Sequence, residues 1–185
     1  MRNLGLSNIS EDLQKPTAGG YVLTISNVED VPMNSNTGKG DYLKINYDIA
    51  EGPFKDYYYS MYKSLGFWGG TLIRSYKPKA LGMFKSFVKE LEHDNPEFHW
   101  NMDDENDEKT MIGRSFGAVI AEEEYRGNDG SIKTRLTVTK IVSIDDIHNG
   151  NFKVPEIKKI ATASNTAVVD TTNDSIEAIT DEAPF

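Results

Sequence analysis

The residues with the clearest binding chemistry lie in one stretch, from Tyr57 to Lys79. This stretch holds seven of the nineteen aromatic residues in the 185-residue chain. From Tyr57 to Lys89 there is no Asp or Glu, although the chain carries a net charge of -9. Aromatic faces stack on bases and cations neutralise phosphates, so this composition suits single-stranded nucleic acid. The alternative is that the tyrosines are ordinary strand residues and the lysines solvate a helix.

The candidate binding residues are large aromatics and cations, and each has a structural alternative. Trp68 could plug the end of a barrel, and the cations near Pro78 could solvate a helix start. The candidates within the stretch are Tyr62, Lys63, Phe67, Trp68, Arg74, Tyr76, Lys77 and Lys79. A second set lies on predicted strands that would border a groove, or that would simply be exposed surface: Tyr42, Lys44, Tyr125, Arg126, Lys133 and Arg135.

The negative net charge does not exclude a polyanionic partner, because the acids are local. Ten of the 29 acids lie in residues 103–108 and 161–185, and these two segments contain no Lys or Arg. The rest of the chain has 19 acids and 20 bases, a net charge of about +1. A bound polyanion responds to the field at its own site rather than to the total charge.

The sequence lacks the motifs that are typical of several classes of enzyme and metal-binding protein. The chain has no cysteine, which excludes disulfides and thiolate chemistry. The acidic residues 103–108 lack the spacing of a calcium-binding loop, and the three histidines are scattered. No Gly-rich phosphate loop or nucleophile elbow occurs. We therefore expect no enzymatic activity, no metal and no cofactor.

The sequence also lacks membrane and export signals. No apolar run approaches the roughly 18 residues of a membrane span, and the N-terminus has no apolar signal region. We expect a protein of the cytoplasm with no membrane partner.

The elements that would position the candidate residues are predicted from periodicity. Strands are predicted at residues 21–28, 41–49 and 57–62, followed by a helix from Pro78 to about Asn95. Two further strands, at residues 112–125 and 131–142, are joined by a tight turn at Asn128-Asp129-Gly130.

Three strands, a helix and two strands is the chain order of an OB-fold barrel. We therefore predict an all-β fold with one helix, an OB-fold-like five-stranded barrel with the helix between the third and fourth strands. Two packed sheets or an α+β sandwich would give the same order. The predicted organisation is an N-terminal arm at 1–18, a domain at 19–160 and a flexible acidic tail at 161–185, whose composition cannot bury enough surface to order itself.

An ordered set of short segments runs from about Gly19 to Ile160. The set is Gly19-Gly20-Tyr21-Val22, Val28-Glu29-Asp30-Val31-Pro32, Tyr42-Leu43-Lys44-Ile45, Tyr47-Asp48-Ile49-Ala50-Glu51-Gly52, Gly66-Phe67-Trp68-Gly69-Gly70, Ile73-Arg74-Ser75-Tyr76-Lys77, Glu122-Glu123-Glu124-Tyr125 and Lys133-Thr134-Arg135-Leu136. It resembles a family of phage single-stranded-DNA-binding proteins, long described as a domain of unknown function in replication and recombination gene clusters. The resemblance implies an OB-like domain that binds single-stranded DNA without sequence preference in phage DNA replication and recombination, in the host cytoplasm.

The last five residues carry a separate resemblance. Asp181, Glu182, Ala183, Pro184 and Phe185 are similar to the acidic tips of bacterial single-stranded-DNA-binding proteins, which dock replication and repair proteins. A terminal Phe can fill a pocket while the carboxylates pair with a basic rim. The resemblance implies that Asp181, Glu182, Pro184 and Phe185 bind such partners, with weaker docking because Ala183 replaces a larger aliphatic residue. A plain solubilising tail is the alternative.

Two other functions also fit the sequence. One is a recombination mediator, a protein-interaction module that acts through its tail and has no intrinsic DNA affinity. The other is a nuclease or polymerase accessory with a carboxylate metal site at Asp103 and Asp104. A homo-oligomer is compatible with each of these functions.

Overall fold

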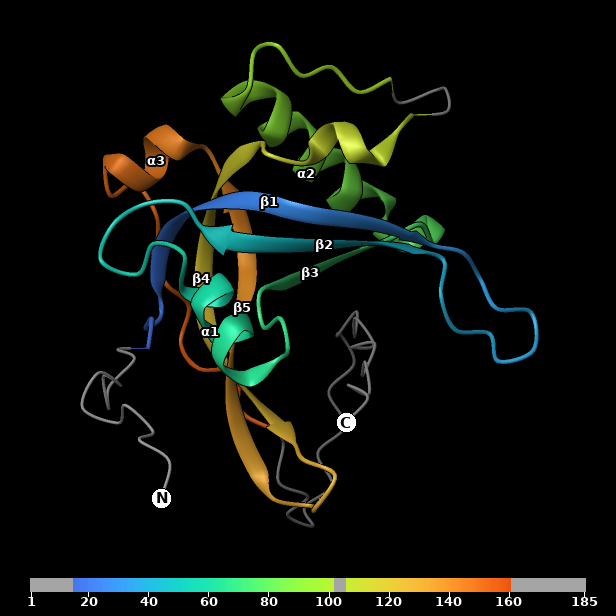
Figure 1. Ribbon diagram of the computed structural model, residues 1–185, viewed down its shortest axis with the longest axis vertical. Helices are drawn as coiled ribbons and strands as arrows, with labels where there is room; N and C mark the ends of the chain where they lie inside the picture. Colours follow the sequence, from blue (N-terminus) through green and yellow to red (C-terminus); the bar gives the residue numbers. More distant parts are fainter. Residues whose placement is uncertain (1–14, 102–105, 161–185) are drawn as a thin grey trace, which may run out of the picture.

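The computed structural model describes residues 15–101 and 106–160 (Figure 1). One antiparallel sheet contains β1 (Gly19–Val31), β2 (Tyr42–Ile49), β3 (Thr71–Ser75), β4 (Ser115–Arg126) and β5 (Ile132–Val142). The helices are α1 (Tyr57–Leu65), α2 (Leu81–Asp94) and α3 (Ile144–His148), with 3-10 turns η2 (Pro78–Ala80) and η3 (Glu108–Met111). None of the helices in these two ranges is long and apolar enough to cross a membrane.

The sheet is open. Its strand order is β3-β2-β1-β4-β5, so β3 and β5 are edges, and the prediction of a closed barrel is wrong. The mainly β architecture and the helix between the third and fourth strands are confirmed, although the described residues contain three α-helices rather than one. Helix α2 contacts both edge strands, β3 and β5, as well as β4. In a closed barrel the two edge strands would pair with each other, whereas here both contact α2.

The tyrosine run is a helix, and the prediction of a strand there is wrong. The third strand is instead Thr71–Ser75, a short segment that follows the glycines. In α1, the side chain of Tyr58 is buried, and its ring meets the ring of Tyr47 edge-on at 5.5 Å. Burial of Tyr58 against the sheet outweighs the weak strand preference of tyrosine.

A carboxylate from β2 holds the start of α1. The Oδ1 atom of Asp48 accepts a hydrogen bond from the backbone N–H of Tyr58 at 2.9 Å, and its Oδ2 atom accepts one from Tyr59 at 2.9 Å. The helix has no capping bond from its own preceding residue, Asp56. Asp48 therefore satisfies first-turn donors that would otherwise lack a partner.

The core lies between the sheet and α2. The predicted alternation in β2 is confirmed, since Leu43, Ile45 and Tyr47 are buried. From α2, the ring of Phe87 meets that of Phe116 on β4 edge-on at 5.4 Å. Residues 116–121 of β4 are all buried, which shows that both faces of this strand are covered.

The β4–β5 hairpin extends beyond the rest of the sheet (Figure 1). The predicted hairpin is confirmed. β1 begins at Gly19, opposite Ile120, so β4 continues past it. Beyond Ile120, β1 no longer pairs with β4, and Lys158 forms a parallel bridge with Glu123 at this edge of β4 instead.

Candidate nucleic-acid interface

Exposed aromatic side chains gather on α1 and the turn that follows it. Tyr59, Tyr62, Leu65 and Phe67 are 49%, 48%, 63% and 55% exposed. They are four of the nine large hydrophobic side chains found exposed in the described parts of the chain. Together with Lys63, we call them the α1 surface. Gly66 ends the helix at a φ of 77°, which favours glycine and turns Phe67 outward from the helix.

Trp68 anchors this surface to the sheet. Its Nε1–H lies 3.1 Å from the carbonyl oxygen of Tyr47 and 3.0 Å from that of Gly70. Its ring is partly buried, and its centre lies 6.1 Å from that of Tyr62. A Cβ at Gly70 would collide with the carbonyl of Tyr47 and the ring of Tyr58, so glycine permits this close approach. Trp68 therefore has a structural role and borders the α1 surface.

Three exposed lysines, one on the α1 surface and two beyond the far end of β3, form no salt bridge with a described residue. The Nζ atom of Lys63 lies 5.4 Å from the ring centre of Tyr59. Lys77 and Lys79 are exposed at the opposite end of β3 from the α1 surface. Within residues 15–101 and 106–160, no carboxylate forms a salt bridge with any of these three lysines. The five residues of β3 span about 17 Å, which separates the two groups of cations.

Arg74 does not lie on the surface, contrary to the expectation that it contacts phosphate. Alternation along β3 turns it inward with Leu72, and only 8% of Arg74 is exposed. Its Nη1 atom donates to the carbonyl of Ile73 at 3.1 Å, and its guanidinium lies 5.3 Å from the ring centre of Phe87. Its Nε atom has no partner among the described residues. Burial lowers the pKa of Arg74 to about 10.

Tyr76 is also engaged in the fold. Its hydroxyl donates to Oδ1 of Asp30 at 2.9 Å, and its ring meets that of Phe84 at 5.8 Å. Burial, together with the hydrogen bond to Asp30, raises the pKa of the Tyr76 hydroxyl. Tyr76 thus joins the end of β3 to β1, and its ring is half-buried rather than free for stacking.

Tyr42 and Lys44 lie between the two groups of cations. They point to the face of β2 opposite to its buried residues, and they pair in register with Ser75 and Ile73 of β3. Both are half-buried, and Nζ of Lys44 lies 4.0 Å from Oε2 of Glu29. Tyr42 and Lys44 therefore lie on the outer face of β2, beside the part of β3 that leads to Lys77 and Lys79.

The hairpin candidates form a separate group whose cations mostly have acidic partners. Tyr125 lies opposite Lys133, and the guanidinium of Arg135 lies 5.3 Å from the Tyr125 ring centre. Arg135 pairs with Glu123 at 3.2 Å, and Lys133 pairs with Asp129 at 3.2 Å. Arg126 instead donates to the carbonyl of Gly130 at 3.4 Å. These neighbours reduce the positive potential that the hairpin offers to a polyanion.

Two members of the α1 surface, Tyr59 and Leu65, are absent from the candidates that the sequence supplied. Tyr59 is passed over when the tyrosine run is taken as a strand. A helical period would have grouped it with Tyr62 on one face.

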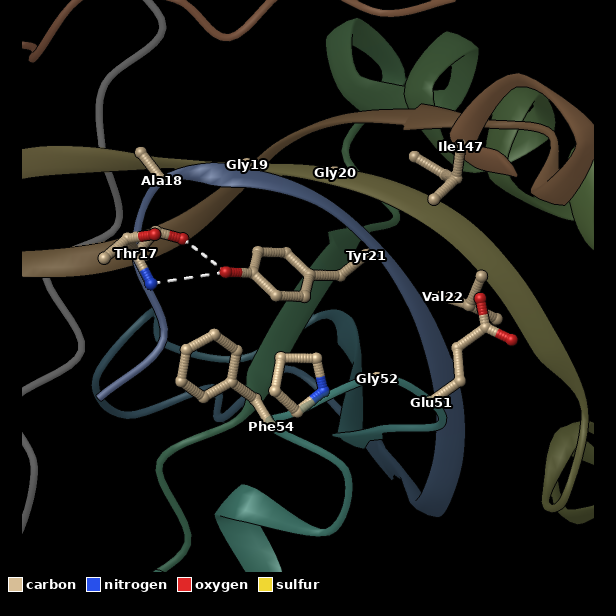
Figure 2. A pocket seen from close by; sticks show the side chains of 11 residues that line it. Thr17, Ala18, Gly19, Gly20, Tyr21, Val22, Glu51, Gly52, Phe54 and Ile147 are labelled. Atoms are coloured by element: carbon tan, nitrogen blue, oxygen red, sulfur yellow. Dashed lines mark hydrogen bonds between the residues drawn. The ribbon is translucent and has the colours of Figure 1, made fainter. Parts of the chain in front are cut away.

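A cavity of about 330 Å³ lies elsewhere, between β1, the loop before α1 and α3 (Figure 2). The hydroxyl of Tyr21 in its wall donates to the carbonyl of Thr17 at 2.7 Å, and Glu51 lies 2.6 Å from Nε2 of His148. Among the described residues, no Lys or Arg lines this cavity, so nothing described in its wall would neutralise a phosphate.

Some predicted features lie outside the described residues. They are the arm up to residue 14, Asp103, Asp104 and Glu105, and the tail residues Asp181, Glu182, Pro184 and Phe185. Within the described residues, no three His, Asp or Glu side chains are placed to hold a metal ion.

Comparison with known proteins adds no family assignment. No protein-family model and no curated protein matches this sequence.

Proposed function

We propose that this protein binds single-stranded DNA without sequence preference through the α1 surface and the adjoining outer face of β2 and β3. The observation that carries the proposal is the cluster of half-exposed aromatic side chains on the α1 surface with Lys63 among them, together with exposed Lys77 and Lys79 at the other end of β3. Tyr62 and Phe67 supply stacking faces, and Lys63, Lys77 and Lys79 supply charges for the phosphates. Stacking tolerates any sequence because every base has a π-face, and it contributes about 1–3 kcal/mol per base.

We further propose that the domain is an OB-like barrel opened between its third and fifth strands. The order β3-β2-β1-β4-β5 has the neighbours expected for such a barrel, except for the pairing of β3 with β5. OB-folds bind oligonucleotides on the face of strands 2 and 3 and on the adjacent loops. This supports a path for the bound single-stranded DNA that crosses Tyr42 and Lys44 on β2.

Titration of a fluorescent oligo-dT with the full chain, over a series of salt concentrations, tests the proposal. Replacing Tyr62 and Phe67 together by Ala should weaken binding at every salt concentration, because stacking is not ionic. Met83→Ala is the matched control, since Met83 is 52% exposed but lies on α2. Equal affinity of the double variant and the control would refute the α1 surface as the site.

The lysines are tested by the salt dependence. Replacing Lys77 and Lys79 by Ala should reduce the slope of log affinity against log salt by about 1.4, that is about 0.7 for each phosphate contact on a single strand. Lys153→Ala combined with Lys159→Ala is the charge-matched control. Arg74→Met should leave the slope unchanged because the guanidinium is buried. An unchanged slope in the Lys77 and Lys79 variant would remove these residues from the site.

We also propose that the acidic C-terminal tip recruits replication or recombination proteins to the coated strand. Phe185→Ala should leave the affinity for oligo-dT unchanged and abolish binding to a protein with a basic-rimmed apolar pocket. Capture of such a protein by the variant as well as by the native chain would contradict this role.

A further inference from the structure

The outer edge of β5 is unpaired over the projecting part of the hairpin. The backbone N–H of Gly127 donates to the carbonyl of Ser131, and in an antiparallel ladder such hydrogen-bonded pairs alternate with pairs that are not bonded. Ile132, Thr134, Leu136 and Val138 therefore direct their backbone groups away from β4. A second hydrogen bond supports this assignment. Glu124 lies opposite Thr134, and its backbone N–H donates to the carbonyl of Lys158, so it points away from β5. In the described parts of the chain, these groups of β5 have no backbone partner.

The two edges of the sheet differ in how they are protected. β3 has five residues, carries the inward-pointing cation Arg74 and is soon followed by Pro78. Short length, an inward charge and a nearby proline all discourage strand addition. β5 has eleven residues, with no proline, no glycine and no buried charge. Its cations are exposed side chains, and its one irregularity is at Thr139, which has no partner in β4.

The same part of β5 has incompletely covered apolar side chains. Ile132, Leu136 and Val138 share one face, because they are separated by even numbers of residues. Ile132 is half exposed, while Leu136 and Val138 are partly buried against the core. An added strand would thus cover apolar surface as well as satisfy backbone groups.

We propose that β5 pairs with β5 of a second copy in antiparallel orientation, with Leu136 opposite Leu136 at a two-fold axis. This register places Thr134 opposite Val138 and Arg135 opposite Thr137, so no two like charges face each other. A register centred one residue earlier would place Arg135 opposite Arg135, which is unfavourable. The pairing ends before the irregularity at Thr139, on the part of the hairpin that projects from the rest of the sheet (Figure 1). The resulting dimer is held by one continuous sheet and is independent of the proposed DNA surface.

Cysteine cross-linking tests the register, because the chain contains no native cysteine. Directly opposed residues of a hydrogen-bonded pair have Cα atoms about 5.5 Å apart, within the range that a disulfide bridges. Leu136→Cys should form a disulfide-linked dimer under mild oxidation. Thr134→Cys should not, whereas the double variant with Thr134→Cys and Val138→Cys should. Equal cross-linking of Thr134→Cys and Leu136→Cys, or none by either, would overturn the proposed register.

A proline variant tests the interface itself. The N–H of Thr134 points away from β4, so Thr134→Pro removes no bond within the hairpin but blocks the added strand. By sedimentation equilibrium, the native chain and Thr134→Val should be dimers and Thr134→Pro a monomer, with the circular dichroism spectrum and melting temperature showing that the variant is folded. A monomeric native chain, or a folded Thr134→Pro that remains dimeric, would refute the proposal. If Thr134→Pro does not fold, the cross-linking result decides.

Discussion

The burial of Arg74 is not explained by its contribution to the free energy of folding. The Arg74 guanidinium is buried and has no carboxylate partner among the described residues, so it loses hydration. The ring of Phe87 and one backbone carbonyl compensate for only part of this loss. The lowered pKa of Arg74 expresses the same cost, since burial disfavours the charged form. The benefit of Arg74 is that an inward-pointing cation on an edge strand disfavours pairing with a foreign strand.

Arg74→Met should therefore make the folded domain more stable. Methionine keeps much of the volume and the contact with Phe87 but removes the unsatisfied Nε donor, so we expect the free energy of unfolding to rise by about 1–3 kcal/mol. Urea denaturation measures the change. A loss of stability similar to that of a core truncation would show that the contacts of the guanidinium outweigh its desolvation.

At the scale of elements, α1 depends on a residue remote from it in sequence. The Asp48 side chain bonds the backbone N–H groups of Tyr58 and Tyr59, and it accepts a further bond from Ile49 at 2.8 Å. Asp48→Asn keeps the shape of the side chain but replaces one acceptor oxygen by a donor. It should lower the free energy of unfolding by about 1–3 kcal/mol, because a buried N–H loses its partner.

Chemical denaturation followed by tryptophan fluorescence measures the effect of Asp48→Asn, since one of the two tryptophans, Trp68, packs beside α1. Asp56→Asn is the control, because Asp56 is an exposed carboxylate directly before α1 and its side chain makes no capping bond. Equal stability of the two variants would mean that α1 does not need the carboxylate.

The cap from Asp48 illustrates why the sequence predicts β2 and α2 but not α1. β2 and α2 have a clear period of two or of about 3.6 residues, and both are predicted close to their true bounds. The tyrosine run has no such clear period. Its helix is stabilised by the ring of Tyr58, which packs on the ring of Tyr47, and by Asp48 of β2, which accepts hydrogen bonds from the first turn. Both are tertiary contacts that local propensity does not contain. The same limit applies to Arg74, because the strand Thr71–Ser75 was not predicted and its inward face was therefore unknown.

At the scale of the whole molecule, Asp94 joins α2 to α3 and to β4. Both of its carboxylate oxygens lie 3.1 Å from the backbone N of Ile144, and Oδ2 also accepts from Gly117 at 3.4 Å. Exposed His93 lies 3.2 Å from the same carboxylate. The hydrogen bond to Asp94 raises the pKa of His93 above its usual 6.5, and the charges of Asp94, Glu90 and Asp145 add to the increase.

This junction gives the domain a small dependence of stability on pH. Because the folded state binds the His93 proton more tightly than the unfolded state, the stabilisation is complete below pH 6.5 and is lost as pH rises through the higher pKa of the folded protein. His93→Gln should remove this part of the pH profile, and Asp94→Asn should lower the pKa of His93 in an NMR titration. An unshifted pKa in the native chain would contradict the pairing. The effect is small, because solvent screens an exposed pair.

Strand β4 has a further consequence for the dynamics of the chain. It is bordered by β1 and β5, and both of its faces are covered from Phe116 to Ala121. Amide protons in such a segment exchange with deuterated solvent only when the whole domain opens, whereas those of the projecting hairpin exchange through local fraying. The protected segment therefore reports global unfolding and the hairpin tip reports local opening, so a single exchange experiment on the native chain separates the two.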